Sequence, residues 1–561
     1  MDARAAPRGF VWWPWAAGIA ALFLALAAYG PALDGAFVFD DRYLPFFLPQ
    51  YANAPWLEWV RGLRPMLMFS FWLNYRASGV DPYSYHAFNV LLHVFNSVMV
   101  ALIAMRLLAR APEGAAAEGD TRLRPTLGIF AGALFLLHPI QTESVAYVAS
   151  RSEVLAASFY LAAYCVFLYR RTQPIGWLRA LAVLALFGGA LATKEHTLTL
   201  PALLLLTDLF WVKGGLRANL RLYVPMALAG ALGGAFVYRI LSSGNTAGFH
   251  TPGFTPATYF YTQWRVICLY LRLLVLPFGQ NADPDVPVSH TPFDPLAFLG
   301  LLLMAALLAA AWIFRKRWPL ASFGVFTFFL LLAPTSSIVP IADAMAERRV
   351  YLPFVGFALV CVEFLRPLKL RRRAMIEVPA LLALFLLTYQ RNAVWGDPMK
   401  LWQDTVAKSP RKVRPRSQLA FAYYERKNCP AAAENYEAAA RLAPPDYPLL
   451  VNWAYSLDCA GQPQAAIEKL LEASKREYDP QAWALLGMVY GKQHKVEEAL
   501  HALDRAQNIN ANYVMTYAVR GNVYESTGDF AAAAEQYQRA LQIDPSNEPV
   551  REALGRVLAR R

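Results

Sequence analysis

Roughly the first 390 residues of the chain form a series of apolar runs, each long enough to approach the thickness of a lipid bilayer. A transmembrane helix needs about 20 apolar residues, because it has to cross a hydrocarbon core of about 30 Å. Candidate spans lie at 10–29, 87–108, 126–146, 153–169, 178–193, 197–212, 222–241, 294–314, 318–333, 350–365 and 375–390. Residues 1–391 are therefore expected to form an all-α, polytopic domain in contact with membrane lipids.

The basic residues predict how this domain is oriented. The net charge is +13, but the Arg and Lys residues gather in short clusters after alternate spans. That distribution is typical of the positive-inside rule and does not indicate nucleic-acid binding. Eleven spans then place the N-terminus in the cytoplasm and the C-terminus outside. The count requires that 262–278, which carries Arg265 and Arg272, is a re-entrant or interfacial helix.

The remainder of the chain is polar, Ala-rich and periodic. Small and bulky residues recur about every 34 residues, as in tetratricopeptide (TPR) repeats. In the last segment this set is Tyr517, Gly521, Tyr524, Ala533, Tyr537, Ala540 and Pro545. We expect a helical connector over 392–412, about four TPR repeats over 413–547 and a capping helix over 548–561. Such an α-solenoid usually offers a concave groove to a peptide or protein, and a rigid spacer is the alternative.

The five cysteines form no CxxC motif and no Cys/His cluster, so they predict no zinc site. Cys429 and Cys459 fall near turns of adjacent repeats. A disulfide between them is one interpretation, and the sequence favours the other, two free thiols.

Polar residues gather in the loops that this topology places on the outer face, where charged groups near a bilayer need a reason. Asp40 and Asp41 form an adjacent pair just beyond the first span, flanked by aromatic residues. Such a pair can supply a general base, or it can simply be a solvated loop. Chemistry alone does not decide between the two.

Three further outer loops, and the stretch that begins at Arg64, carry the other candidates for a shared site. The loop residues are His138, Glu143, Arg151, Lys194, Glu195, Glu347, Arg348 and Arg349. His86, Asn89 and His93 lie at i, i+3 and i+7, which gives one polar helix face. Two histidines about two turns apart make a poor pair of metal ligands, so a hydrogen-bonding face toward a cavity is favoured over a metal site.

Several of these segments occur in a characteristic order: FVFDDR (37–42), RP (64–65), YHAFNVLLH (85–93), LHPIQTESVAYVASRSEVLAA (137–157), TKEHTLTLP (193–201) and MAERRVYLP (345–353). Together with the C-terminal repeats they resemble the TMTC proteins (transmembrane and TPR-containing protein O-mannosyltransferases) and their bacterial relatives. The resemblance covers essentially the whole chain. It implies a GT-C-fold glycosyltransferase that needs no metal or other cofactor.

The resemblance also implies a reaction and a set of roles. A sugar would pass, with inversion, from a polyprenyl-phosphate carrier to a hydroxyl of a protein (Ser/Thr) or glycan acceptor outside the cytoplasm. Asp40 or Asp41 would deprotonate that hydroxyl. Lys194, Arg348 and Arg349, and less directly Arg64, would stabilise the leaving lipid phosphate. The residues that would shape the site are His86, Asn89, His93, His138, Glu143, Arg151, Glu195 and Glu347.

Two other functions remain open at this point. One is a ligase or polymerase of lipid-linked oligosaccharides, although such enzymes typically carry a long external loop late in the chain. The other is a non-enzymatic, membrane-anchored TPR scaffold for envelope assembly. The absence of any N-x-[ST] sequon favours a bacterial inner membrane over the endoplasmic reticulum.

Overall fold

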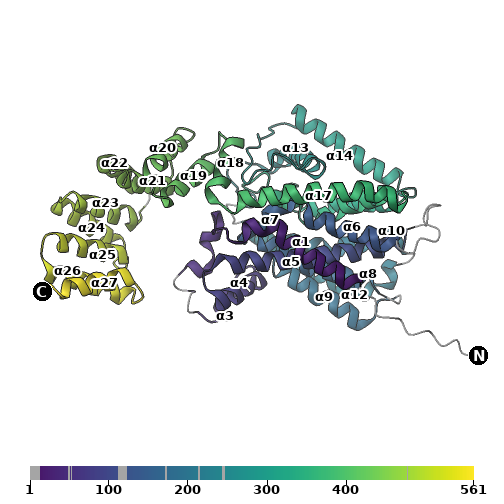
Figure 1. Ribbon diagram of the computed structural model, residues 1–561, viewed down its shortest axis with the longest axis horizontal. Helices are drawn as coiled ribbons and strands as arrows, with labels where there is room; N and C mark the ends of the chain where they lie inside the picture. Colours follow the sequence, from purple (N-terminus) through teal and green to yellow (C-terminus); the bar gives the residue numbers. More distant parts are fainter. Residues whose placement is uncertain are drawn as a thin grey trace, which may run out of the picture. The chain divides into compact units, whose positions relative to one another are not determined.

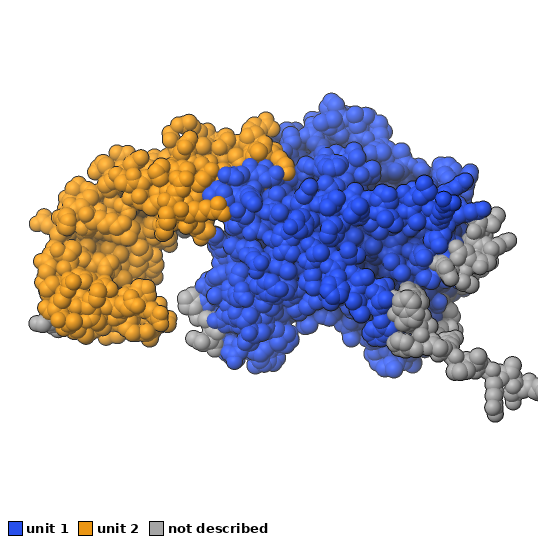
Figure 2. Space-filling model, viewed as in Figure 1, with its two compact units in different colours: residues 1–404 blue, residues 405–561 orange. Residues whose placement is uncertain are grey.

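The structure is a computed structural model that describes residues 13–48, 51, 54–111, 123–170, 174–212, 215–242, 247–476 and 478–560 (Figure 1). The described residues are helical and contain no β-strand beyond one isolated bridge between Ala247 and Ile341. The chain separates into two compact units, Met1–Asp404 and Thr405–Arg561 (Figure 2). We call them the membrane unit and the repeat unit.

Every predicted span overlaps a helix of the membrane unit. These helices are α1 (Trp13–Leu33), α5 (Pro82–Leu108), α6 (Leu123–Leu137), α8 (Arg151–Leu168), α9 (Trp177–Leu191), α10 (Leu200–Trp211), α12 (Leu220–Leu241), α14 (Pro295–Ile313), α15 (Pro319–Leu332), α16 (Phe354–Leu365) and α17 (Leu370–Trp395). The first three residues of the predicted span 10–29 lie outside the described residues.

Length and hydropathy support fewer crossings than eleven. Among the described residues, five segments can cross a membrane: Trp15–Leu33, Pro82–Leu108, Val148–Leu168, Leu220–Arg239 and Pro295–Ile313. A sixth consists of α6 and Pro139–Ala146, which meet at a bend of 52°. Helices α9, α15 and α16 are apolar but shorter. The chain thus has several membrane-type helices, and the number eleven stays a prediction.

Helix α13 (Pro256–Val275) covers most of the segment that we expected not to cross the membrane, and it is not among the spanning candidates. Its Arg265 donates a hydrogen bond of 2.6 Å to Asp294, the N-cap residue of α14. The other short helices of this unit are α3 (Trp56–Trp59), α4 (Pro65–Ser78), α7 (Thr142–Ala146), α11 (Gly215–Ala218) and α18 (Pro398–Lys408).

Small residues set how closely helices pack in the membrane unit. A Cβ atom on Gly356 of α16 would lie 2.3 Å from the carbonyl oxygen of Gly324 on α15, so these two helices touch through their backbones. The same holds where the end of α1 meets the end of α17. There a Cβ atom on Gly396 would lie 2.1 Å from the carbonyl oxygen of Pro31. Asn392 reinforces this contact by donating to the Ala28 carbonyl at 3.0 Å.

The described part of the repeat unit consists of helix pairs. They are α19 (Val413–Glu425) with α20 (Cys429–Ala440), α21 (Tyr447–Cys459) with α22 (Pro463–Ser474), α23 (Pro480–Lys492) with α24 (Val496–Ile509), and α25 (Val514–Ser526) with α26 (Phe530–Ile543). The small-and-bulky pattern joins the members of a pair. A Cβ atom on Gly521 would lie 2.5 Å from the Tyr537 ring, so a larger residue would push α25 and α26 apart. The final helix α27 (Glu548–Leu558) buries Val550, Ala553 and Val557.

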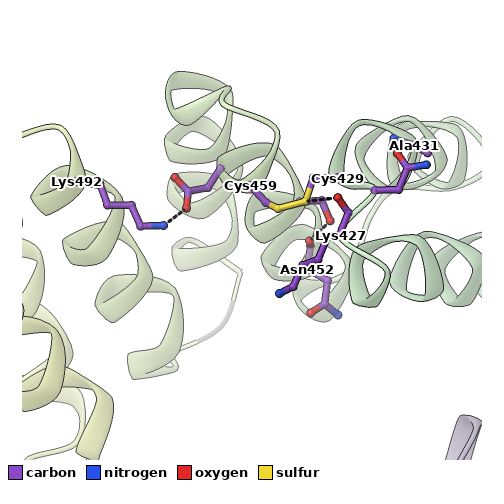
Figure 3. Close-up of a disulfide and its surroundings, with 9 residues drawn as sticks. Lys427, Cys429, Ala431, Asn452, Cys459 and Lys492 are labelled. Atoms are coloured by element: carbon purple, nitrogen blue, oxygen red, sulfur yellow. Dashed lines mark hydrogen bonds and ion pairs between the residues drawn. A yellow bond between two sulfur atoms is a disulfide. The ribbon is translucent and has the colours of Figure 1, made fainter. Parts of the chain in front are cut away.

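Cys429 and Cys459 form a disulfide, with their Cα atoms 5.6 Å apart (Figure 3). The sequence favoured two free thiols, and that interpretation was wrong. The fold places the first residue of α20 beside the last residue of α21, although 30 positions separate them in the sequence. The bridge therefore ties the first repeat to the second. Cys165, Cys268 and Cys361 are free.

Candidate active site

Asp40 and Asp41 lie on a short 3-10 helix, η1 (Phe39–Tyr43), in the connection after α1. Asp41 is fully buried, and its carboxylate accepts the backbone N–H of Val38 at 3.1 Å and that of Ala149 at 2.6 Å. Burial raises the pKa of Asp41 to about 8, against the lowering effect of these backbone donors. Asp41 thus joins two loops to one another and has both oxygens engaged.

Asp40 has a different environment, although it is the next residue in the chain. Its side chain is exposed, and its backbone N–H donates to the Tyr147 hydroxyl at 3.0 Å. Burial, together with the neighbouring Asp41 and Asp40 carboxylates, raises the pKa of Tyr147. Of the two predicted catalytic carboxylates, only Asp40 is open to a reactant.

Arg348 lies near Tyr147, the residue whose hydroxyl accepts the Asp40 backbone N–H. It forms an ion pair with the buried carboxylate of Glu143, and its backbone N–H donates to the same carboxylate at 3.1 Å. The Arg348 side chain is 21% exposed, and its buried partner Glu143 orients it. A second carboxylate, Asp343, lies 3.7 Å from it.

Lys194 and Arg64 belong to the same electrostatic neighbourhood. The Lys194 ammonium donates to the Glu153 carboxylate at 2.5 Å and to the Ser152 hydroxyl at 3.1 Å. Burial lowers the pKa of Lys194, and Glu153 opposes that change. Arg64 makes two parallel hydrogen bonds of 3.0 Å to Glu195 and is partly exposed.

Arg349 and Glu347 flank Arg348 on the short helix η6 (Glu347–Val350) and hold its loop in place. Arg349 is buried and donates to the Tyr259 hydroxyl and to the backbone carbonyls of Asp343 and Ala344. These hydrogen bonds engage both terminal nitrogens of Arg349, and its role as a phosphate ligand stays a prediction.

Glu347 is also buried. It accepts the Asn281 backbone N–H at 2.7 Å and the Gln280 side-chain amide at 3.0 Å. Burial raises the pKa of Glu347 to about 7, and the nearby Arg391 counteracts this rise. Glu347 therefore ties the loop of Arg348 to the segment that contains Gln280 and Asn281.

The predicted polar face of α5 is buried and binds other backbone segments. His86 contacts the Gly35 carbonyl at 3.0 Å, and Asn89 donates to the Val145 carbonyl at 3.2 Å. His93 contacts the Tyr351 hydroxyl at 2.8 Å and the Leu136 carbonyl at 3.1 Å. His138 likewise contacts the Leu274 carbonyl at 3.1 Å. These hydrogen bonds connect the segments that carry the candidate residues.

Arg151 is fully buried, and its hydrogen-bond partners are neutral. It donates to Asn89 Oδ1 at 2.8 Å and to the backbone carbonyls of Tyr85 and Ser70 at 3.1 and 3.3 Å. Its guanidinium also lies 4.4 Å from the centre of the Phe71 ring. A buried charge held in this way depends on every partner, because losing one leaves a polar group unsatisfied.

A small cavity lined by Phe39, the residue before Asp40, includes residues that sequence reasoning missed. Its volume is only about 10 Å³, room for about one water molecule, and its walls include Phe39, Glu143, Tyr147, Arg348, Trp395 and Trp402. Tyr147 lies between Glu143 and Arg151, two residues that the sequence predicted to belong to the site. Trp402 lies on α18, in the stretch expected to be a connector, and no sequence signal linked it to the site.

The described residues contain no group of three or more His, Cys, Asp or Glu side chains that could hold a metal ion. The site instead consists of one exposed carboxylate, several cations with buried carboxylate partners, and aromatic rings.

The chain is similar to known repeat families and to curated membrane glycosyltransferases. A TPR repeat model matches residues 521–560 and a tetratricopeptide repeat model matches residues 480–513. The protein O-mannosyl-transferase F38B6.6 of Caenorhabditis elegans is 24% identical over 75% of this chain and 62% of its own length. Human TMTC3 is 20% identical over 87% of this chain and 58% of its own length. The curated homologues of this chain are TMTC-family protein O-mannosyltransferases.

One relative is more similar over a shorter part of the chain. Tmtc1 of Drosophila melanogaster is 30% identical, over 52% of this chain and 33% of its own length. The chain spans about 60% of the length of the first two relatives that it matches. Among solved structures, TTC0263, a thermophilic TPR protein of Thermus thermophilus, is 17% identical over 32% of this chain and 95% of its own, with a TM-score of 0.27.

Proposed function

We propose that this chain is a membrane glycosyltransferase that moves a sugar from a polyprenyl-phosphate carrier to a hydroxyl of a protein acceptor. One observation carries the proposal. The exposed Asp40 is joined through its backbone N–H to Tyr147, which lines one small cavity with the Glu143–Arg348 ion pair, in a chain whose curated homologues are protein O-mannosyltransferases. The homologues also favour mannose as the sugar and Ser or Thr as the acceptor.

Asp40 acts as the general base in this proposal, and Asp41 holds the loop. The acceptor oxygen attacks the anomeric carbon, and Asp40 takes the hydroxyl proton. The bond between the anomeric carbon and the phosphate oxygen breaks, and its electron pair leaves with the lipid phosphate. Attack from the face opposite the phosphate inverts the anomeric centre. General-base assistance typically contributes a factor of about 10²–10⁴ in rate.

Arg348 stabilises the negative charge that grows on the leaving phosphate. A cation held rigidly by a buried carboxylate is already oriented before the reaction, which makes electrostatic stabilisation effective. Lys194 is the second candidate, since its ammonium is fixed by Glu153 and Ser152. Arg64 pairs with Glu195 at a more exposed position and is better suited to receiving the carrier.

The repeat unit acts on the acceptor side of the membrane in this scheme. The disulfide between Cys429 and Cys459 supports an extracytoplasmic location, since disulfides persist mainly in oxidising compartments. This agrees with the distribution of basic clusters and with a bacterial inner membrane as the location. A TPR array there can present an acceptor protein or peptide to the membrane unit.

The proposal is tested by mass spectrometry of extracytoplasmic proteins from cells that lack the gene and carry a variant copy. Peptides with hexose on Ser or Thr should be lost without the gene and return with the natural chain. They should stay absent with Asp40→Asn and return with Asp34→Asn, a change at an exposed carboxylate in the same connection. Asp41→Asn should mainly lower the amount of folded protein. Hexose-bearing peptides that persist in Asp40→Asn cells would refute the proposal.

A further inference from the structure

A groove lies between the end of α8 and the start of α9, two helices that pack against each other (Figure 1). Helix α8 begins at Arg151, a residue of the candidate site, and its 18 residues end at Leu168, next to the groove. At a rise of 1.5 Å per residue this helix is about 27 Å long. The groove is therefore separated from the candidate site by roughly the thickness of a bilayer's hydrocarbon core, which is about 30 Å.

The groove has the size and the lining of a site for an amphipathic molecule. Its volume is about 520 Å³, within the range of about 300–1,000 Å³ that is typical of small-molecule sites. Val166, Leu178 and Ala182 contribute apolar lining, whereas Arg170 and Arg179 contribute positive charge. Leu178 is 84% exposed, as expected of a side chain that faces lipid. An apolar groove with cations in its wall suits a lipid that carries a charged headgroup.

Arginines from neighbouring segments surround the end of α8. Arg106 and Arg110 each donate to the Leu168 carbonyl at 3.0 Å. Arg179, in the first turn of α9, donates to the Tyr169 carbonyl at 2.8 Å. The carbonyl groups at the end of a helix carry only partial negative charge. These hydrogen bonds therefore orient the three guanidinium groups without neutralising them.

Carboxylates do not balance this charge. Among the described residues, the one ion pair of the cluster joins Arg170 to the buried Asp208, whose other oxygen accepts from two neutral side chains. Arg221 of α12 lies 5.0 Å from the centre of the Trp177 ring, which lines the groove and is 65% exposed. Tryptophan is enriched at the level of lipid headgroups. The cluster thus holds an excess of positive charge where a headgroup would lie.

The start of α9 adds backbone donors to the same groove. Gly176, which lines the groove, is the N-cap residue of α9 and offers no side chain to cap it. The Ala180 N–H pairs with the Gly176 carbonyl at 2.9 Å, but the N–H groups before it have no partner within the helix. Such N–H groups, together with the helix dipole, favour a phosphate. Side-chain cations and a helix N-terminus thus meet at one place.

We propose that this groove binds an anionic phospholipid of the predicted cytoplasmic leaflet. The phosphate lies by Arg179 and the start of α9, and an acyl chain follows the apolar lining past Ala182. Basic pockets between membrane helices on the cytoplasmic side are typical sites for anionic headgroups. A zwitterionic lipid has no net charge to balance the arginines, and a free phosphate ion has no chain to fill the apolar part. This site is independent of the proposed transfer reaction.

The test measures the lipid preference of the full-length protein in a neutral detergent by native mass spectrometry. The probes are phosphatidylglycerol, phosphatidylcholine with the same acyl chains, and short-chain polyprenyl phosphate. The natural chain should bind phosphatidylglycerol at least about tenfold more tightly than phosphatidylcholine, since each arginine near a lipid headgroup contributes a factor of about five. Equal binding of the two phospholipids would overturn the inference. Displacement of phosphatidylglycerol by polyprenyl phosphate would assign the groove to the sugar carrier and would overturn it as well.

Three variants locate that preference. Arg179→Gln should lower it about fivefold. Ala182→Phe fills the groove without changing the charge and should abolish it, whereas a preference that survives would trace it to diffuse surface charge and sink the inference. Arg371→Gln removes the same charge at an exposed position of α17 and should leave the preference unchanged. If Ala182→Phe fails to fold, Arg179→Gln decides against Arg371→Gln, and equal preferences in these two variants contradict the site.

Discussion

The two units of this chain bury different kinds of side chain. The membrane unit encloses Asp41, Glu143, Arg151 and Glu347, each held by partners far away in the sequence. The repeat unit packs mainly through size, as where Gly521 admits the Tyr537 ring. Its buried Arg520 pairs with Asp504 only 16 positions away. The membrane unit is therefore held by polar contacts between distant parts of the chain, whereas the repeat unit repeats a local packing rule.

The largest expected effect comes from breaking the buried network of the membrane unit. Arg151→Met removes the donor to Asn89 and to two backbone carbonyls, and each partner left unsatisfied costs about 1–3 kcal/mol. We expect this variant to yield little monodisperse protein in detergent. Arg76→Met, at an exposed position on α4, is the control and should behave normally. Normal yield and melting of Arg151→Met would mean that the network contributes little to folding.

The next effect is on catalysis. Arg348→Gln should lower kcat for transfer by about 10²–10³, the typical cost of removing one electrostatic stabiliser of the transition state. Arg348→Lys should recover part of the rate because it restores the charge but not the fork geometry. Arg61→Gln changes an exposed arginine that pairs only with Glu58 in a local i, i+3 contact, and should be silent. A kcat that is unchanged in Arg348→Gln would remove Arg348 from the mechanism.

A smaller effect should be confined to the repeat unit. Replacing Cys429 and Cys459 with serine opens a link across 30 positions and should lower the stability of that unit by about 3 kcal/mol. Hydrogen exchange should rise in α19 to α22 and stay constant in the membrane unit. Cys268→Ser changes a free cysteine and is the matched control. Faster exchange throughout the membrane unit would show that the two units do not unfold separately.

The smallest effect concerns pH. Because burial raises the pKa of Glu347 from 4.5 to about 7, the folded state favours its protonated form. Its contribution to stability is complete below pH 4.5 and is lost as the pH rises to about 7. The melting temperature of Glu347→Gln should therefore decline less over this interval than that of the natural chain. Glu58→Gln, at a partly exposed carboxylate, should follow the natural chain, and a parallel decline in Glu347→Gln would contradict the assignment.

The sequence predicted the repeat unit well because its packing rule is local. The spacing of Gly521 and Tyr537 within one repeat is enough to place α25 against α26. The sequence also predicted a helix at each proposed span, because a long apolar run is a local feature of the chain. The disulfide escaped prediction because it depends on where α20 begins and α21 ends, which the spacing of two cysteines does not reveal.

For the candidate site, the sequence identified the loops but could not assign roles within them. Asp40 and Asp41 are chemically identical, and only the fold shows that one is exposed while the other binds two backbone N–H groups. Arg348 and Arg349 differ in the same way, since the first side chain is partly exposed and the second is buried. Trp402 could not be found at all, because its contact with Phe39 joins positions about as far apart as the membrane unit allows.

The division between the units falls inside α18, because Pro398–Lys408 crosses the boundary after Asp404. Anyone who exchanges repeat arrays between such proteins should therefore cut after Lys408. A chimera joined at the end of α17 would import a foreign residue at the position of Trp402, whose ring packs near Phe39, the residue before Asp40. The boundary for exchanging repeat arrays therefore lies after Lys408, at the end of α18, and not at the end of α17.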